Sequence, residues 1–191
     1  MKCMVCENYS LTHICKSCQN IYLTPIIYKR DLLEDITVIS FYKYDEIKDL
    51  LHTKHTDLGY YIFNILAQNS FLKFAQEFKY TQKLTSIPID DNVLNNYSHT
   101  AILNKHLKSP YIHPVYNRLR ATNHINYSGK SKLFRIQNPR NFTLNKLPKN
   151  DVILVDDIIT TGSTLTQAIE LLKKNKINVL FCLTLCDLRN R

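Results

Sequence analysis

The segment from Asp151 to Leu185 constrains the fold more than any other part of the sequence. Residues 152–155 form an uninterrupted apolar run of the kind found in strands that are buried on both faces of a parallel sheet. A polar turn at 156–164 follows, then apolar residues at helical spacing, and then a second apolar run at 177–185. This order predicts a strand–helix–strand unit. The turn would lie at the carboxyl end of a strand, where open α/β sheets bind ligands.

The side chains of this turn favour a sugar phosphate. Asp156 and Asp157 end the strand, and two adjacent carboxylates can accept hydrogen bonds from the neighbouring hydroxyls of a ribose. Gly162 permits a left-handed backbone, so that amides of the turn and of the following helix can point at a phosphate. Further hydroxyl donors are Thr160, Thr161, Ser163 and Thr164. These features predict a ribose 5-phosphate site, with an acid pair that only caps a helix as the alternative.

An apolar run, two acids, two spacers and Thr-Thr-Gly-x-Thr resemble the phosphoribosyl pyrophosphate (PRPP) signature of type I phosphoribosyltransferases. The match holds position by position from Asp156 to Thr164. The resemblance implies a phosphoribosyltransferase-like parallel sheet flanked by helices. It also implies that the two carboxylates bind the ribose hydroxyls, that the loop wraps the 5-phosphate, and that Mg²⁺ accompanies PRPP.

The amino terminus carries two Cys-x-x-Cys pairs, Cys3 with Cys6 and Cys15 with Cys18. Eight residues separate the pairs, so four thiolates can surround one tetrahedral ion, and Zn²⁺ is the metal we expect. A structural zinc would also explain how so small a segment becomes ordered. Redox-active cysteines are the alternative, and His13 is a weaker candidate ligand.

The net charge of +9 arises from one segment. Residues 92–150 contain ten Lys or Arg and no Asp or Glu, whereas the rest of the chain has 15 basic and 16 acidic residues. A field of one sign favours a polyanionic partner, and a solvated basic surface is the alternative. Interleaved aromatic residues such as Tyr116 could stack on bases, which favours single-stranded DNA. The candidate DNA-binding residues are Lys105, Lys108, Arg118, Arg120, Lys130, Lys132, Arg135 and Arg140.

The remaining pattern predicts further elements of an α/β domain. Strands are expected at 36–44, 84–89 and 111–115, and helices at about 45–51, 58–66, 71–78 and 98–107. Residues 117–148 predict a long loop with one strand near 133–136. We expect a four-cysteine zinc module at 1–20, a linker or extended arm at 21–35 and a phosphoribosyltransferase-like domain at 36–191. The sequence has no run of eighteen apolar residues and predicts no transmembrane helix, so we expect a soluble cytoplasmic protein.

A cysteine head, a connecting segment and a carboxy-terminal PRPP loop together resemble the ComF family of bacterial competence proteins. Tyr97, Ser98 and His99 match a family motif, but Asn95 and Asn96 stand where the family has Arg and Gly. Those departures bear on transferase turnover rather than on PRPP binding. Further matches are Tyr42 or Tyr44, Lys54-His55, Ile87-Pro88-Ile89, Arg120, Arg135, Asn138 and Phe142.

The resemblance implies a role in natural transformation, in which the protein handles incoming single-stranded DNA in the cytoplasm. DNA-uptake proteins at the inner membrane would then be its partners. Two alternatives stay open. One is an active transferase acting on a nitrogen acceptor, with Lys54 or Arg120 stabilising the departing pyrophosphate. The other is a nucleotide-sensing regulator built on the same fold.

Overall fold

The computed structural model describes residues 1–33, 35–90, 93, 97–123, 134 and 137–189. Its centre is a seven-stranded sheet, in which β8 (Ile158–Ile159) pairs only with β9 and the other six strands lie side by side. All neighbours in this sheet are parallel except β1 and β2, which are antiparallel. The spatial order is β1 (Tyr28–Leu33), β2 (Ile36–Lys43), β9 (Val179–Asp187), β7 (Val152–Val155), β3 (Leu84–Pro88) and β4 (Ile112–Pro114).

Strand β7 shows why the apolar runs lie at the centre of the sheet. Its four residues are fully buried, and alternate side chains point to opposite faces. Ile153 and Val155 belong to one hydrophobic cluster, and Val152 and Leu154 to the other. Each face of the sheet therefore has its own core, as expected of a parallel sheet that is covered on both sides.

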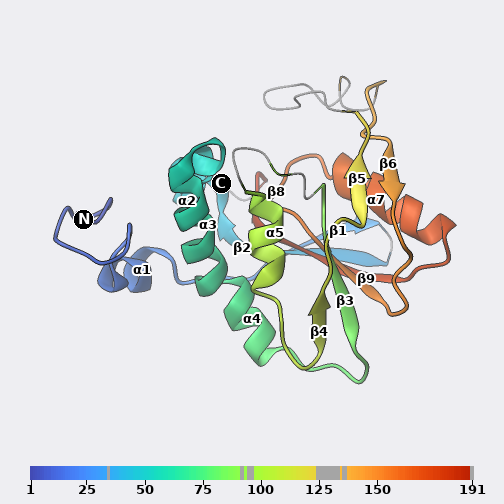
Figure 1. Ribbon diagram of the computed structural model, residues 1–191, viewed down its shortest axis with the longest axis horizontal. Coiled ribbons are helices and arrows are strands. Elements are labelled where there is room, and N and C mark those ends of the chain that lie inside the picture. The colour runs from blue at the N-terminus through green and yellow to red at the C-terminus, as the bar shows by residue number, and fades with distance from the viewer. Residues whose placement is uncertain (34, 91–92, 94–96, 124–133, 135–136, 190–191) are drawn as a thin grey trace.

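Helices cover the two faces unequally (Figure 1). One face packs against the helices that lie between β2 and β4 in the chain, with Phe63, Leu66 and Phe71 fully buried there. The other face is covered by α7 (Ser163–Lys174), through Leu165, Ala168, Ile169 and Leu172. The first group comprises α2 (Tyr44–Leu51), the 3-10 helix η1 (His52–His55), α3 (Asp57–Asn69), α4 (Phe71–Glu77) and α5 (His99–Lys105). The predicted α/β class, the strand–helix–strand unit and these helices are confirmed.

The segment 117–148 differs from its prediction. A two-stranded antiparallel ribbon, β5 (Leu119–Ala121) with β6 (Phe142–Leu144), occupies part of the range predicted as a loop. Strands of three residues carry too little alternation to be detected in a sequence. The strand expected near 133–136 is wrong at Phe134, which is helical and whose carbonyl accepts the amide of Asn138 at 3.0 Å. The other residues of that range lie outside the described part.

The cysteine head docks on the main domain through buried contacts. It ends in α1 (Lys16–Tyr22), and Asn69 Nδ2 of α3 donates to Gln19 Oε1 at 3.0 Å. The Tyr42 hydroxyl donates to the carbonyl of Leu23 at 3.1 Å. Strand β1, inside the range expected to be a linker or an extended arm, adds to the edge of the sheet. Within the described ranges, no helix has the length and apolar character that a membrane span requires.

Candidate functional site

Two carboxylates stand where β7 ends. The Asp156 amide donates to the carbonyl of Leu183 at 3.0 Å, and the Leu185 amide donates to the carbonyl of Asp157 at 3.0 Å, so pairing with β9 fixes both backbones. The Asp157 amide also donates to Asp156 Oδ1 at 2.9 Å. The Asp157 side chain is only 7% exposed, whereas Asp156 is half-buried and open to a ligand. The acid pair is thus held in a defined geometry at the carboxyl edge of the sheet.

Asp157 lies beside two basic side chains from the helical face. Lys54 Nζ of η1 lies 3.1 Å from Asp157 Oδ2, and His99 Nε2, at the start of α5, lies 3.6 Å from the same oxygen. Burial alone would raise the pKa of Asp157, but the charges of Lys54 and His99 outweigh burial and lower it. The charge of Asp157 in turn raises the pKa of Lys54. Both members of the Lys54–Asp157 pair are therefore charged at neutral pH.

The pKa of Asp156 is shifted in the opposite direction. Burial and the negative charge of Asp157 raise its pKa well above the ordinary value. The two neighbouring carboxyl groups therefore differ in their readiness to ionise, and together they hold a proton more easily than two exposed aspartates would. A ribose diol needs both hydrogen-bond donors and acceptors nearby, and a pair of this kind offers both.

The loop after the acid pair adopts the conformation that its glycine allows. Gly162 has φ 88° and is the N-cap of α7. A Cβ at this position would also lie 2.3 Å from Leu32 Cδ1 of the neighbouring β1. Thr161 Oγ1 lies 3.0 Å from Ser163 Oγ and accepts the Ser163 amide at 3.3 Å. The backbone thereby turns into a twelve-residue helix, and the first amides of a helix can bind an anion.

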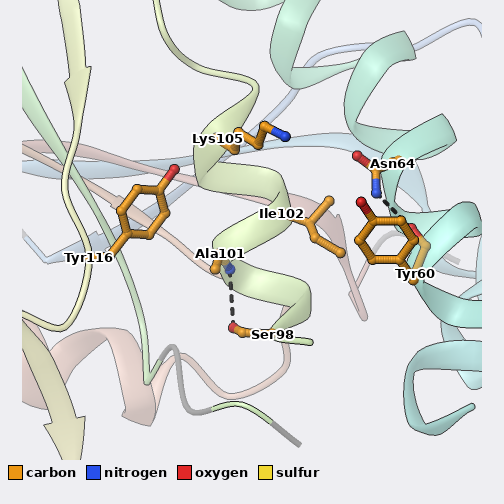
Figure 2. Close-up of a pocket in the computed structure, with 7 residues that line it drawn as sticks. All are labelled: Tyr60, Asn64, Ser98, Ala101, Ile102, Lys105 and Tyr116. Atoms are coloured by element: carbon orange, nitrogen blue, oxygen red, sulfur yellow. Dashed lines mark hydrogen bonds between the residues drawn. The ribbon is translucent and has the colours of Figure 1, made fainter. Parts of the chain in front are cut away.

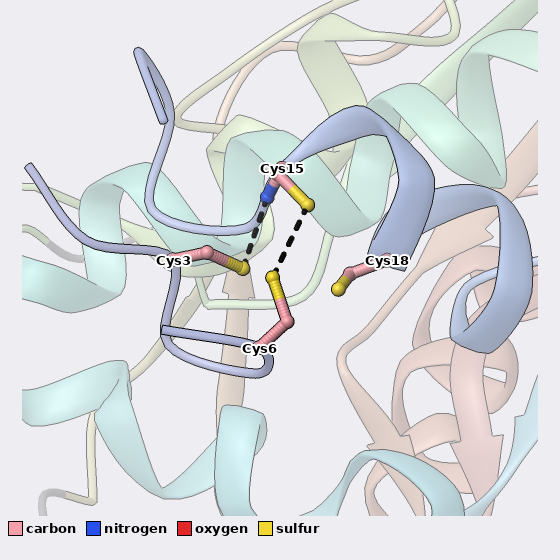
Figure 3. A group of neighbouring side chains, drawn as sticks. All are labelled: Cys3, Cys6, Cys15 and Cys18. Atoms are coloured by element: carbon pink, nitrogen blue, oxygen red, sulfur yellow. Dashed lines mark hydrogen bonds between the residues drawn. The ribbon is translucent and has the colours of Figure 1, made fainter. Parts of the chain in front are cut away.

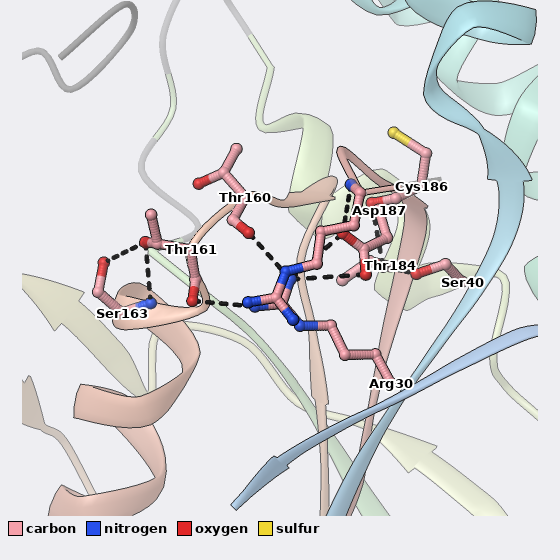
Figure 4. Close-up of polar contacts among 9 residues, drawn as sticks. Arg30, Ser40, Thr160, Thr161, Ser163, Thr184, Cys186 and Asp187 are labelled. Atoms are coloured by element: carbon pink, nitrogen blue, oxygen red, sulfur yellow. Dashed lines mark hydrogen bonds and ion pairs between the residues drawn. The ribbon is translucent and has the colours of Figure 1, made fainter. Parts of the chain in front are cut away.

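Arg30 of β1 holds this loop from behind (Figure 4). Its guanidinium donates to the carbonyl of Thr160 at 2.9 Å and to the carbonyl of Thr161 at 3.1 Å. It also lies 3.2 Å from Asp187 Oδ1 at the end of β9, and both side chains are largely buried. The sequence analysis did not identify Arg30 or Asp187, because a lone arginine in a segment expected to be a linker carries no motif.

Lys54 is placed by a tyrosine and a glycine. The Tyr97 hydroxyl donates to the carbonyl of Lys54 at 2.6 Å and to that of Thr56 at 3.2 Å. Gly59 makes room for this contact, because a Cβ there would lie 2.0 Å from the Tyr97 hydroxyl oxygen. The other candidate catalytic residue, Arg120, lies exposed on β5 beside Asn117, and no contact in the described residues joins it to the acid pair.

The four cysteines of the head converge (Figure 3). The sulfur atoms of Cys3, Cys6, Cys15 and Cys18 all lie within 4.8 Å of one another, so the cluster could hold a metal ion such as zinc. Backbone amides of Val5 and Cys15 donate to the Cys3 sulfur at 3.4 and 3.3 Å. The two Cys-x-x-Cys pairs therefore form one site, as their spacing predicts.

The pKa values of the cysteine thiols in this cluster are also compatible with a bound cation. Amide donors from Cys15 and Cys6 lower the pKa of Cys3 to about 6, which favours its thiolate. Burial and the neighbouring sulfurs raise the pKa of Cys18 to about 12. Four thiolates in so small a volume repel one another, so a bound cation would be needed to keep all four ionised.

The predicted DNA-binding residues fall into three groups. Lys105, Lys108 and Arg120 are exposed. Arg118 and Arg140 are half-buried, and Arg140 lies 3.5 Å from Asp90 Oδ2. The other three, Lys130, Lys132 and Arg135, lie outside the described residues.

Residues 116–191 match the family model described as the phosphoribosyl transferase domain. The carboxy-terminal part of the chain is similar to a phosphoribosyltransferase domain. The matched segment contains the acid pair, the loop, α7 and β9. The chain has the predicted α/β fold, a largely parallel sheet flanked by helices. A search of curated protein sequences found no match.

Solved phosphoribosyltransferase structures resemble the chain at low identity. A hypoxanthine phosphoribosyltransferase from Staphylococcus aureus is 18% identical, with coverage of 68% of this chain and 65% of that one and a TM-score of 0.42. An adenine phosphoribosyltransferase from Saccharomyces cerevisiae is 20% identical, with coverage of 91% and 90% and a TM-score of 0.43. An orotate phosphoribosyltransferase from Aeropyrum pernix is 17% identical, with coverage of 90% and 80% and a TM-score of 0.41. The chain thus spans about two thirds of the length of the Staphylococcus aureus protein.

Proposed function

We propose that the chain binds PRPP at the acid pair and the loop that follows it. The observation that carries this proposal is the continuous path from Asp156 and Asp157, through the left-handed turn at Gly162, to the amino terminus of α7. The carboxyl groups would hold the ribose hydroxyls, and the amides and hydroxyls of Thr160–Thr164 would surround the 5-phosphate. The hydrogen bonds from the buried Arg30 to the carbonyls of Thr160 and Thr161 hold the loop in one conformation before the phosphate binds.

Lys54 is the residue we assign to the pyrophosphate of PRPP. Its ammonium lies 3.1 Å from Asp157 Oδ2, and the Lys54 side chain is 31% exposed, so it can turn from Asp157 to an incoming phosphate. The charge attracts pyrophosphate in the ground state and stabilises it as it departs. Arg120 stays a second candidate for the same role. Mg²⁺, bound to PRPP, would neutralise part of the pyrophosphate charge. Its own charge would favour ionisation of the partly exposed Asp156, whose carboxylate oxygens are ligands of the type it prefers.

We propose further that the protein is a competence factor of the ComF type, which handles incoming single-stranded DNA in the cytoplasm close to the uptake machinery. What supports this is the four-cysteine head joined to a phosphoribosyltransferase domain, together with the acid-free segment 92–150. Lys105, Lys108 and Arg120 of that segment are exposed and could contact phosphates.

A transferase is the second candidate function, favoured by the position of Lys54 beside Asp157. In that reaction an acceptor nitrogen bonds to C1 of PRPP as the bond from C1 to pyrophosphate breaks. The leaving group takes the electron pair, and the acceptor proton passes to water. Release of pyrophosphate in the presence of nucleobases or ammonia would establish it. If PRPP binds but no acceptor in that panel causes pyrophosphate release, the protein binds PRPP without acting as a transferase on those acceptors.

Two titrations test the main proposal. PRPP with Mg²⁺ should bind the metal-loaded protein, and Asp157→Asn should abolish that binding. Labelled single-stranded oligonucleotide should bind with an affinity that falls steeply between about 50 and 200 mM salt, because phosphate contacts release counterions. Oligonucleotide affinity that is indifferent to salt would remove the DNA-binding role and leave the PRPP site standing.

A further inference from the structure

A cavity lies on the surface of α5 (Figure 2). The first residue of α5, His99, faces Asp157 of the acid pair. The volume of the cavity is about 220 Å³, below the roughly 300 Å³ at which pockets for drug-sized ligands begin. Tyr60 and Asn64 of α3 line one side, and Tyr116, in the segment between β4 and β5, lines the other. Ile102 of α5 lies between them. The cavity is thus an open depression with an apolar floor and an aromatic ring on either side.

The polar groups of the cavity suit a nucleic acid. Lys105, at the end of α5, is exposed and supplies a positive charge. Among the described residues that line the cavity, none is acidic. Asn64 is held in place, because its Nδ2 donates to the carbonyl of Tyr60 at 2.8 Å and its Oδ1 lies 3.0 Å from His106 Nε2. An oriented amide and an exposed ammonium next to aromatic rings are the elements of a site for stacked bases and their phosphates.

Both tyrosines present accessible rings. Tyr60 is 46% exposed and Tyr116 is 39% exposed. Figure 2 places them on opposite sides of α5, so a single free base would not lie between them, whereas successive bases of an extended strand could reach both. The arrangement therefore favours a strand over a mononucleotide.

The cavity is connected to the acid pair through two short paths. The Tyr60 ring packs edge-on against Tyr97 with centroids 6.1 Å apart, and Tyr97 holds the carbonyl of Lys54. Ser98, which also lines the cavity, caps α5 by accepting the Ala101 amide at 3.2 Å, and the next residue, His99, faces Asp157. A strand bound over α5 would therefore pass close to bound PRPP.

We propose that the surface formed by Tyr60, Asn64, Ile102, Lys105 and Tyr116 binds single-stranded DNA, with one base stacked on each tyrosine and Lys105 at an intervening phosphate. This inference rests on the DNA-binding part of the proposed function and assigns that function to a specific surface. It places the DNA strand on α5 and α3, rather than on the β5–β6 ribbon, which carries Arg120.

The test compares tyrosine variants that keep apolar bulk but lose the ring. Tyr60→Leu and Tyr116→Leu should each weaken binding of a labelled oligothymidylate of about 12 nucleotides by about 5- to 150-fold. Tyr80→Leu is the matched control, since Tyr80 is 36% exposed and does not line the cavity, and it should bind like the wild type. An abasic oligonucleotide of equal length should bind the wild type more weakly and respond to neither cavity variant. Lys105→Gln should lower the slope of log affinity against log salt by about 1.

Each alternative outcome has a distinct meaning. If the wild type binds the oligonucleotide and neither tyrosine variant loses affinity, this surface is not the DNA-binding site, and the proposed function still stands. Equal losses with thymidylate and abasic strands would also overturn it, because the tyrosines would then act on the backbone. No binding by the wild type would overturn the DNA-binding function itself. A PRPP titration of Tyr116→Leu should match the wild type and shows that the variant is folded.

Discussion

The Arg30 guanidinium lies 3.2 Å from the Asp187 carboxylate and joins the edge strand β1 to the end of β9. The same guanidinium donates to the carbonyls of Thr160 and Thr161, so one side chain holds two consecutive residues of the loop. A lysine cannot reproduce this set of contacts, because its ammonium lacks the planar fork of donors. Arg30 is thus a positioning residue for the loop.

Arg30→Met should destabilise the protein and weaken PRPP binding. Removing one partner of a buried ion pair costs about 3 kcal/mol, which corresponds to a decrease of roughly 6–12 °C in the melting temperature of a chain of this size. The double variant Arg30→Met with Asp187→Leu should recover most of the stability, because it leaves no unpaired buried charge. Its PRPP affinity should stay low, since the loop carbonyls still lack their donors. Full recovery of affinity in the double variant would contradict the positioning role.

Asp156→Asn should stabilise the ligand-free protein at neutral pH. Since burial and Asp157 raise the pKa of Asp156, the folded protein retains a proton that the unfolded chain releases above about pH 4. The folding stability due to this proton is lost as the pH rises through the elevated pKa. The asparagine cannot ionise and can still accept the Asp157 amide, so the melting temperature at about pH 8 should rise by about 2–4 °C per kcal/mol gained.

The neighbouring Asp157→Asn is the contrasting variant. The pKa of Asp157 is lowered, so its contribution to stability is present above about pH 4 and is lost only as the pH falls below that range. Thermal melts between about pH 5 and 8 should show Asp157→Asn below the wild type throughout, because Lys54 and His99 lose their partner. If both variants shift the melting temperature in the same direction, the claim that the pKa of Asp156 is raised while that of Asp157 is lowered would be refuted.

The acid pair and its loop could be predicted from the sequence because their chemistry is local. Asp156 to Thr164 are consecutive, and the apolar runs around them specify a buried strand and a helix. The four cysteines were predictable for the same reason, since their spacing alone brings them together. Short-range patterns of this kind need no knowledge of how the sheet is ordered.

The residues that complete the site could not be predicted, because sheet order decides them. Arg30 contacts Thr160 across 130 residues of sequence only because β1 pairs with β2, and β2 lies beside β9. Lys54 reaches Asp157 because η1 and β7 meet at the same edge of the sheet. Lys54 was a candidate only through the family resemblance, and His99 was noted as a motif residue without a role. Neither contact leaves a periodic signal in the sequence.

Gly162→Ala should weaken both the fold and the phosphate site. A left-handed backbone costs a residue with a side chain about 1–2 kcal/mol, and the new Cβ would meet Leu32 Cδ1. We expect a decrease of roughly 2–8 °C in melting temperature together with a loss of PRPP affinity. Adding Leu32→Ala should relieve the contact but not the backbone strain, so recovery should be partial. A single variant that melts and binds like the wild type would show that the turn does not need its glycine.

Metal removal should loosen the amino-terminal head. A metal present at about 100 times its Kd contributes about 2.7 kcal/mol, so chelation should lower the melting temperature by roughly 5–10 °C. Native mass spectrometry should find one zinc per chain in the wild type and none in Cys6→Ser, which removes the exposed thiol of the four-cysteine cluster. Met4→Ser, in the same loop and also exposed, should keep the metal. Stoichiometric zinc in Cys6→Ser would mean that the four sulfurs do not act as one site.

Calorimetric titration of PRPP and Mg²⁺ into the zinc-loaded protein tests the central assignment most directly. The account predicts saturable binding at one site per chain, competition by ribose 5-phosphate, and loss of the signal in Asp157→Asn. Absence of binding of either ligand to the folded wild type, or equal binding to the Asp157→Asn variant, would contradict it.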